Sequence, residues 1–179
     1  MAGLADPVKA ITMVGTVKDG RVTAPSDASQ DPRSEPGGWH RPLHHTRAGH
    51  LDDATAQTPG MDRREAVSGR LCGAQAIWMG QTTVAPAVAS ADHHHGRSET
   101  GIYVVSGHPV FVFLDRESGQ ENRIETGPGD YVYVPPWTPH REENPSSVEP
   151  AVVVLARSTQ EAIVVNLVDL GGDEAPASQ

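Results

Sequence analysis

Apolar and polar residues alternate along the chain from about Val67 onward, a period of two that predicts short β-strands. The apolar stretches end at turns rich in glycine and proline, such as the Gly-Pro-Gly-Asp turn at 127–130. We expect strands within residues 71–84, 102–105, 110–114, 122–125, 131–134, 152–156 and 162–168. The second and third of these flank a Ser-Gly-His-Pro turn and are expected to pair as a hairpin. Many short strands joined by such turns favour an all-β sandwich or barrel.

The part of the chain before this alternation has a different composition. Residues 19–64 are rich in Pro, Asp, Ser, Thr and Gly and show neither a strand period nor a helical period. We therefore expect an extended, mostly irregular N-terminal arm at 1–65, with Trp39 and Leu43 as its apolar anchors. A β-barrel domain is expected at 66–170 and a disordered C-terminal tail at 171–179.

Charge and composition exclude several classes of function. Among 179 residues, 14 Lys and Arg stand against 23 Asp and Glu, giving a net charge of -9, so no nucleic-acid partner is expected. The apolar runs are far shorter than the roughly 20 residues that cross a bilayer, and the N-terminus does not read as a secretory signal. The single cysteine, Cys72, excludes an internal disulfide and suits a reducing compartment. We expect a cytoplasmic protein with no membrane partner.

Three consecutive histidines precede a predicted strand, and they are the first candidate for chemistry. Side chains alternate along an extended chain, so His93 and His95 share one face and His94 takes the other. Two imidazoles on one face supply two ligands of a metal ion, and Glu99 can return a carboxylate to that side past Gly96. The alternative is that the histidine run is a surface feature with no ligand role.

A second candidate is His140, which follows a proline-rich turn where the chain would enter a strand beside the histidine pair. Around it, four residues stand at fixed intervals: Gly129, Pro135, His140 and Asn144. The earlier stretch holds a similar series: Ala87, His93, His95, Glu99 and Gly107. Together the two series resemble the two sequence motifs of the cupin family, and the strand pattern extends the likeness to residues 71–170.

The sequence departs from the cupin motifs in three ways. Ala87 and Trp137 stand where the family has glycine, and neither position is a ligand. Seven residues rather than six separate Glu99 from Gly107. A β-bulge must absorb the extra residue if Glu99 is a ligand. If none does, Thr100 takes the register of the family's glutamate, and the site consists of three histidines and water.

The cupin resemblance implies a jelly-roll β-barrel with one divalent transition metal per chain inside it. The implied metal ligands are His93, His95, Glu99 and His140. Such ligands suit Fe(II), which we favour, and also Mn, Ni, Zn, Co or Cu. A metal held in this way keeps coordination positions for water, substrate or dioxygen.

Aromatic residues of the barrel are candidates for a substrate pocket, although ordinary core packing is the favoured interpretation for each of them except Trp137. The predicted pocket residues are Trp78, Tyr103, Tyr133 and Trp137. Gln81 and Arg64 could orient a polar substrate. Glu142 and Glu143 are interpreted as a solvated face. The remaining histidine group, His40, His44, His45 and His50, fits no regular zinc spacing.

Three functions remain open. The favoured one is a non-haem metal-dependent dioxygenase acting on a small molecule with chelating oxygens. The second is a non-redox isomerase, lyase or cyclase of the polyketide cyclase type, which uses the metal as a Lewis acid. The third is a non-catalytic metal or ligand-binding module. The resemblance also implies a homodimer, to which the arm could contribute.

Overall fold

The computed structural model describes residues 17–18, 21–22, 42–115 and 117–172, and the chain divides into two units, Met1–Leu43 and His44–Gln179. In the first unit, β1 (Val17–Lys18) and β2 (Arg21–Val22) pair antiparallel. Much of the predicted arm, including Trp39 and His40, lies outside the described residues, as does the tail from 173 to 179.

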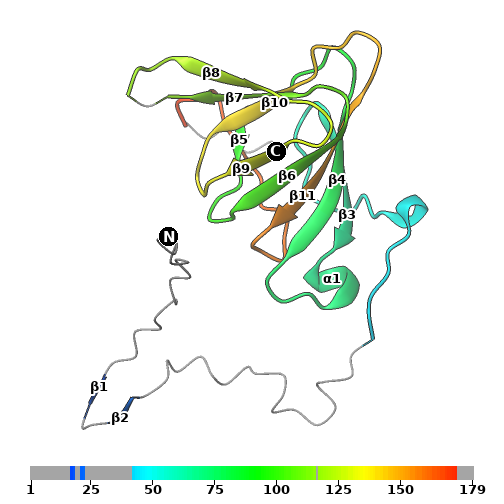
Figure 1. Cartoon of the computed structure of the whole chain (residues 1–179), viewed down its shortest axis with the longest axis vertical. Helices are drawn as coiled ribbons and strands as arrows, with labels where there is room; N and C mark the ends of the chain where they lie inside the picture. Colours follow the sequence, from blue (N-terminus) through cyan, green and yellow to red (C-terminus); the bar gives the residue numbers. More distant parts are fainter. Residues whose placement is uncertain (1–16, 19–20, 23–41, 116, 173–179) are drawn as a thin grey trace, which may run out of the picture. The chain divides into compact units, whose positions relative to one another are not determined.

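The second unit consists of two five-stranded antiparallel sheets that face each other (Figure 1). Sheet 1 contains, in spatial order, β3 (Met61–Val67), β4 (Trp78–Val84), β11 (Ala151–Arg157), β6 (Thr100–Ser106) and β9 (Tyr131–Val134). Sheet 2 contains, in spatial order, β12 (Val165–Asn166), β5 (His93–His94), β10 (His140–Glu143), β7 (Val110–Leu114) and β8 (Glu121–Glu125). Two short helices complete it: a 3-10 turn at Ala48–His50 and α1 at Gly69–Cys72. The predicted all-β jelly-roll barrel is confirmed.

The core between the sheets consists of side chains from alternate positions along the strands. On β4 and β11 every second residue is buried, and Val153 and Leu155 of the central strand β11 are at most 1% exposed. Ile102 and Val104 of β6 pack against them in the same cluster. Burial of each such side chain contributes about 1.5–3 kcal/mol, so the apolar period of two in the sequence determines which face of each strand turns inward.

The predicted hairpin between residues 102–105 and 110–114 is wrong. These segments form β6 and β7, which belong to different sheets, and β7 pairs with β8 instead. Gly107 at the turn has a φ of 76°, and a Cβ there would lie 2.8 Å from the Cα of Ala151. A glycine is therefore needed where the chain crosses from one sheet to the other close to β11.

The first barrel strand begins earlier than the sequence suggested. β3 starts at Met61 and pairs with β4, whereas residues 61–65 were expected to belong to the arm. The inward residues of this strand are Arg63 and Glu65, which are charged. A pattern of apolar residues therefore could not reveal the strand. The expected strand at 162–168 is shorter than predicted and includes only Val165 and Asn166.

Candidate metal centre

Sheet 2 places residues that are distant in sequence side by side at one level of the barrel. His93 of β5 lies opposite His140 of β10, and His140 in turn lies opposite Phe113 of β7. On the other side, His93 lies opposite Asn166 of β12. Directly paired residues of neighbouring strands project to the same face, so this level of the sheet points into the interior as one row.

Three histidines of this region form a compact buried group. His93, His95 and His140 are 0%, 1% and 3% exposed, and their ligand atoms all lie within 4.8 Å of one another. The ring centroids of His93 and His140 are 4.4 Å apart, and those of His95 and His140 are 4.7 Å apart. Among the described residues, no other group of three or more His, Cys, Asp or Glu residues is arranged in this way.

Hydrogen bonds leave one nitrogen of each ring available. The Nδ1–H groups of His93 and His140 donate to the carbonyl oxygens of Ala91 and Thr138, both at 2.9 Å. His95 Nδ1 lies 2.8 Å from the hydroxyl oxygen of Thr100. The Nε2 atoms of the three histidines are buried and have no hydrogen-bond partner. Ligand histidines are commonly held through Nδ1 in this way, so the three residues fit a divalent metal bound by Nε2.

The surroundings of His93 and His95 favour the neutral form of their imidazoles. Burial, followed by the neighbouring His140, lowers the pKa of His93 to about 3, while Glu142 opposes the effect. Burial also lowers the pKa of His95 well below its ordinary value, and the charge of Arg157 is the next largest cause. A neutral imidazole has the lone pair that a metal ion needs, so this environment suits ligation at neutral pH.

The structure does not bring Glu99 to the three histidines. Its side chain is exposed and accepts a hydrogen bond from the Tyr133 hydroxyl at 2.9 Å. The pairing of β11 with β6 does contain an irregularity, which leaves Val105 without a partner. This irregularity lies beyond the ligand region, so it does not turn Glu99 inward. Thr100 points into the barrel instead. Thr100 contacts His95 rather than adding a carboxylate to the site.

The two positions where the cupin motifs have glycine keep the glycine conformation. Ala87 has a φ of 54° and Trp137 a φ of 62°, and no other described non-glycine residue has a positive φ. The backbone N–H of Trp137 donates to the Gly96 carbonyl at 2.8 Å, next to the histidine run. The fold therefore retains these left-handed turns at a cost of about 1 kcal/mol each.

The predicted pocket residues lie in different environments. Trp78 is 0% exposed and donates from its indole nitrogen to Glu65. Tyr103 lies on the outer face of β6, and the exposed Trp137 contacts His94 at a ring distance of 5.5 Å. Only Tyr133 borders a cavity at the histidine site. That cavity has a volume of about 210 Å³ and is lined by Phe111, Phe113, Ile124, Val132, Tyr133, Val134, Pro135, Thr138 and His140.

Glu142 is a buried residue of the site, and the prediction that it belongs to a solvated face is wrong. It is 1% exposed, and its Oε2 lies 3.8 Å from His93 Nε2, while its Oε1 has no hydrogen-bond partner. Burial raises the pKa of Glu142, but the nearby His93 and His140 and the two buried arginines together lower it below its ordinary value. The signal was present in the sequence, because Glu142 follows His140 by two residues and so shares its face of the strand.

Two buried arginines were also missed. Arg63 and Arg157 are 0% and 1% exposed inside the barrel, whereas the predicted Arg64 is exposed and pairs with Asp62. Gln81, the other polar candidate, faces away from the buried side of β4. Adjacent residues on a strand face opposite sides of the sheet. Which of Arg63 and Arg64 faces the interior therefore depends on where the opposite sheet lies.

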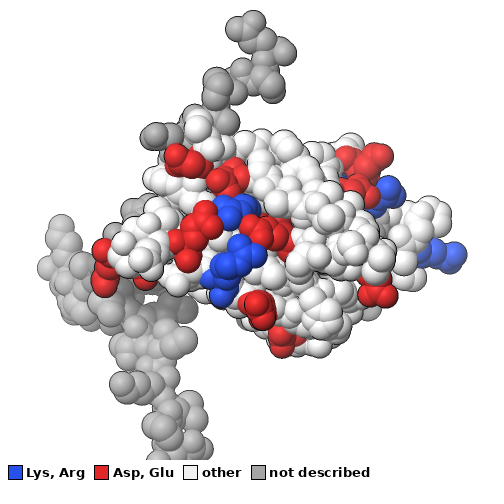
Figure 2. Space-filling model, turned by 90° about the horizontal axis from the view of Figure 1, so that it is seen from above, with Lys and Arg blue, Asp and Glu red and all other residues white. Residues whose placement is uncertain are grey.

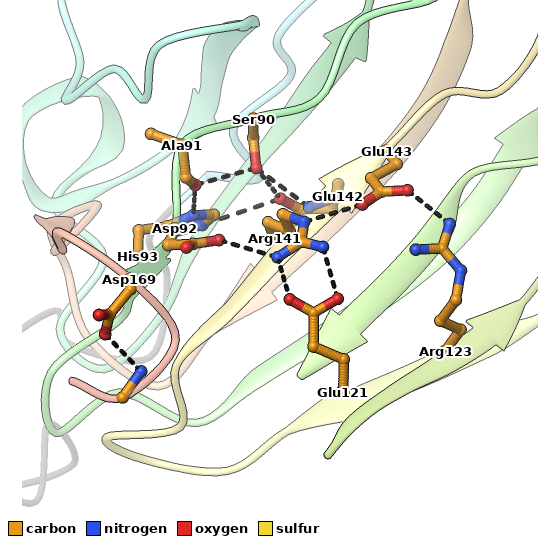
Figure 3. Close-up of polar contacts among 11 residues, drawn as sticks. Ser90, Ala91, Asp92, His93, Glu121, Arg123, Arg141, Glu142, Glu143 and Asp169 are labelled. Atoms are coloured by element: carbon orange, nitrogen blue, oxygen red, sulfur yellow. Dashed lines mark hydrogen bonds and ion pairs between the residues drawn. The ribbon is translucent and has the colours of Figure 1, made fainter. Parts of the chain in front are cut away.

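The outer face of sheet 2 carries a separate set of ion pairs. Arg141 bonds to Glu121 at 2.9 Å, and Arg141 and Arg123 both contact Glu143 (Figure 3). Figure 2 shows basic groups set among acidic groups on the face of the molecule seen from above. Along β10, His140 and Glu142 therefore face the interior while Arg141 and Glu143 form the solvated surface.

The second histidine group does not form a comparable cluster. His44, His45 and His50 border an open hollow on the surface and are exposed, and His40 lies outside the described residues. His44 is within hydrogen-bond distance of Thr46.

Within the described ranges, no helix has the length and apolar character required to cross a membrane.

The fold and the site define a small β-barrel protein with a buried three-histidine metal-ligand group. Residues 80–157 match the model of the Cupin domain family. This matched segment contains all three histidines of the buried group. No curated protein matches the chain significantly.

Solved structures share this fold. Oxalate decarboxylase from Bacillus subtilis aligns at 23% identity with a TM-score of 0.54, over 62% of this chain and 28% of that chain. The polyketide cyclase RemF from Streptomyces resistomycificus aligns at 17% identity with a TM-score of 0.56, over 71% of this chain and 87% of that chain. The chain thus spans less than a third of the length of the oxalate decarboxylase chains, but most of the length of RemF.

Proposed function

We propose that this protein is a metal-dependent enzyme that acts on a small molecule, and that its reaction is of the non-haem dioxygenase type. One observation carries the proposal: three buried imidazoles direct unpartnered Nε2 atoms at one another while their Nδ1 atoms are held. Three protein ligands leave more than one coordination position for other molecules. A site that only stores or seals a metal would instead be expected to fill its coordination shell with protein ligands.

The cavity beside His140 indicates the form of the substrate. It has a volume of about 210 Å³, and most of its walls are apolar, with Phe111, Val132 and Val134 among them. This space suits the apolar part of a small molecule. The oxygens of the same molecule would face the histidines. We therefore propose an enol, hydroxy-ketone or catechol-like substrate.

The donor set suits Fe(II), Mn(II), Ni(II), Cu(II), Co(II) and Zn(II), and we favour Fe(II). One of the similar oxalate decarboxylase structures concerns the Mn(II) centres of that enzyme, so Mn(II) is the second choice. When bound, the metal would supply Lewis acidity and a position for dioxygen.

The residues of the chain itself have distinct roles in this proposal. His93, His95 and His140 hold the metal. With Nε2 of His95 on the metal, its Nδ1–H donates a hydrogen bond to the Thr100 hydroxyl oxygen, which fixes the orientation of the ring. Glu142 is placed to accept a proton at Oε1 from a substrate hydroxyl or enol. These groups are buried in the barrel, away from water, which strengthens the electrostatic interactions among them.

Oxygen uptake tests the reaction. Purified protein is loaded anaerobically with Fe(II) and mixed in air with catechol and with 2,4-pentanedione, while an electrode records oxygen. We expect uptake that depends on substrate and is lost in His140→Ala. An Fe(II)-loaded protein that consumes no oxygen with any chelating substrate tested would refute the dioxygenase reaction.

A non-redox reaction of the cyclase or isomerase type is the second candidate. It is favoured by the buried carboxylate of Glu142 beside His93, because proton transfer at an enolisable carbon needs such a base. The similarity to RemF, which is a polyketide cyclase, agrees with this candidate at the level of the fold. Turnover that continues with Zn(II) in the absence of air would support it over the dioxygenase.

Self-association and a cytoplasmic location stay predictions. A homodimer would show twice the chain mass in sedimentation equilibrium. Comparison of the full chain with residues 42–179 tests whether the first 41 residues contribute to association.

A further inference from the structure

Arg157 lies at the end of β11, inside the barrel and next to the histidine group. Its strand partners are Thr100 on β6 and Trp78 on β4, and all three are at most 1% exposed. Paired residues share a face, so Arg157 is the direct neighbour of the threonine that holds His95.

One edge of the Arg157 guanidinium is unused. Its Nη1 donates to the Ile163 carbonyl at 2.9 Å, and its Cζ lies 5.4 Å from the centre of the Trp78 ring. Nε and Nη2 are buried and have no hydrogen-bond partner. In a guanidinium, the Nε–H bond and one Nη2–H bond are parallel and match the two oxygens of a carboxylate. Arg157 therefore presents a preformed bidentate donor inside the barrel.

The interior also has more positive than negative charge. Arg63 is buried as well and donates to neutral acceptors, Ala56 O, Thr58 Oγ1 and Met61 Sδ. Within the described part of the chain, no carboxylate forms an ion pair with Arg63 or Arg157. Even with Glu142 ionised, the two positive charges of Arg63 and Arg157 exceed its single negative charge. A divalent metal would add two further positive charges. Buried charges need compensation, which a bound anion supplies.

The other buried carboxylate does not restore this balance. Glu65 accepts hydrogen bonds from Ser68 and Trp78 and pairs with Arg70 at 3.2 Å, so its charge is already matched. Burial lowers the pKa of Arg157 to about 9, with the charge of Arg63 as the next cause, which still leaves the group protonated at neutral pH.

We propose that the substrate of this site carries a carboxylate and that the Nε–Nη2 edge of Arg157 binds it. The oxygens that chelate the metal belong to the same molecule and face the three histidines. The proposal rests on the proposed function and specifies its substrate class: a small carboxylic acid with a neighbouring oxygen donor. Arg157 is then a residue that determines specificity and is separate from the metal ligands.

Calorimetric titration with two matched probes tests this assignment. Pyruvate and 2,3-butanedione have similar shapes and share a methyl ketone with an oxygen donor on the adjacent carbon, but only pyruvate carries a carboxylate charge. Both are titrated into metal-free and Zn(II)-loaded protein. The variants are Arg157→Gln, Arg157→Lys and the control Arg64→Gln, which removes the same charge from the outer face of β3. Metal content is measured separately for each protein.

We expect wild-type protein, with or without Zn(II), to bind pyruvate at least about tenfold more tightly than 2,3-butanedione. Arg157→Gln should lose this preference at unchanged metal content, and Arg64→Gln should keep it. If Arg157→Gln does not fold, Arg157→Lys tests the proposal instead. This variant keeps the positive charge but lacks the two parallel N–H donors, so pyruvate binding should weaken.

Equal binding of the two probes by the wild type would overturn the proposal. So would a full preference for pyruvate in a folded Arg157 variant. Failure of the proposed function has a different signature: the protein binds no metal, or its Fe(II)-loaded form takes up no oxygen, whatever the calorimetry gives.

Discussion

Acid should destabilise the metal-free protein, because the folded state holds two ligand histidines in the neutral form. Burial lowers the pKa of His93 to about 3 and that of His95 well below its ordinary value. In the unfolded chain both groups return to a pKa of about 6.5. The unfolded state therefore binds more protons below that pH. The stabilising contribution is complete above pH 6.5 and is lost progressively as the pH falls toward 3.

The magnitude follows from proton linkage. Each histidine that is neutral when folded and protonated when unfolded lowers the free energy of unfolding by about 1.4 kcal/mol per pH unit. For His93 and His95 together, the expected loss between pH 6 and pH 5 is about 2–3 kcal/mol. This window lies above the range in which most carboxylates titrate, so the histidines dominate it.

Urea unfolding of chelator-treated protein at several pH values, followed by tryptophan fluorescence, measures this loss. A His93→Asn variant serves as the comparison and should reduce the pH slope by about half, since one of two titrating groups is removed. A wild-type free energy of unfolding that does not change between pH 6 and pH 5 would refute the reasoning. So would a slope that is the same in the variant, because the loss would then come from other groups.

Four substitutions test the remaining structural claims. His140→Ala should reduce bound metal sharply while the circular dichroism spectrum of the barrel is retained; full occupancy would contradict its role as a ligand. Glu99→Gln should leave metal content unchanged, since Glu99 is exposed and bonded to Tyr133. Ala87→Gly should raise the free energy of unfolding by about 1 kcal/mol, because φ is 54° there, and an unchanged melting temperature would argue against strain. Leu155→Ala, at 0% exposure in the central strand, should cost about 2–5 kcal/mol in urea unfolding.

The local pattern of the sequence predicted much of the fold and part of the site. The period of two located β9 at 131–134 and most of β11, and it placed His93 and His95 on one face. The motif spacing brought His140 into the same group. Each of these predictions depends either on the alternation of side chains along one strand or on the spacing of residues within a family motif. Neither requires knowledge of the opposite sheet.

Other features depended on contacts that local alternation does not encode. Residue Arg63 faces inward and Arg64 outward, and the difference comes from the register of β3 on β4. The pairing of β6 with β11 and β9 turns Thr100 inward, which leaves Glu99 in solvent. The connection at Gly107 joins two sheets, although its composition also suits a hairpin.

The sequence alone therefore determined the β-barrel class and the three histidines, since alternation and motif spacing are properties of the chain. Only the tertiary structure decided that Arg63 and Arg157 are buried inside the barrel. Charged residues show no apolar pattern, so their burial is visible only when the two sheets are assembled around them. The physical reason is that the charge inside the barrel depends on which strands pair and in which register.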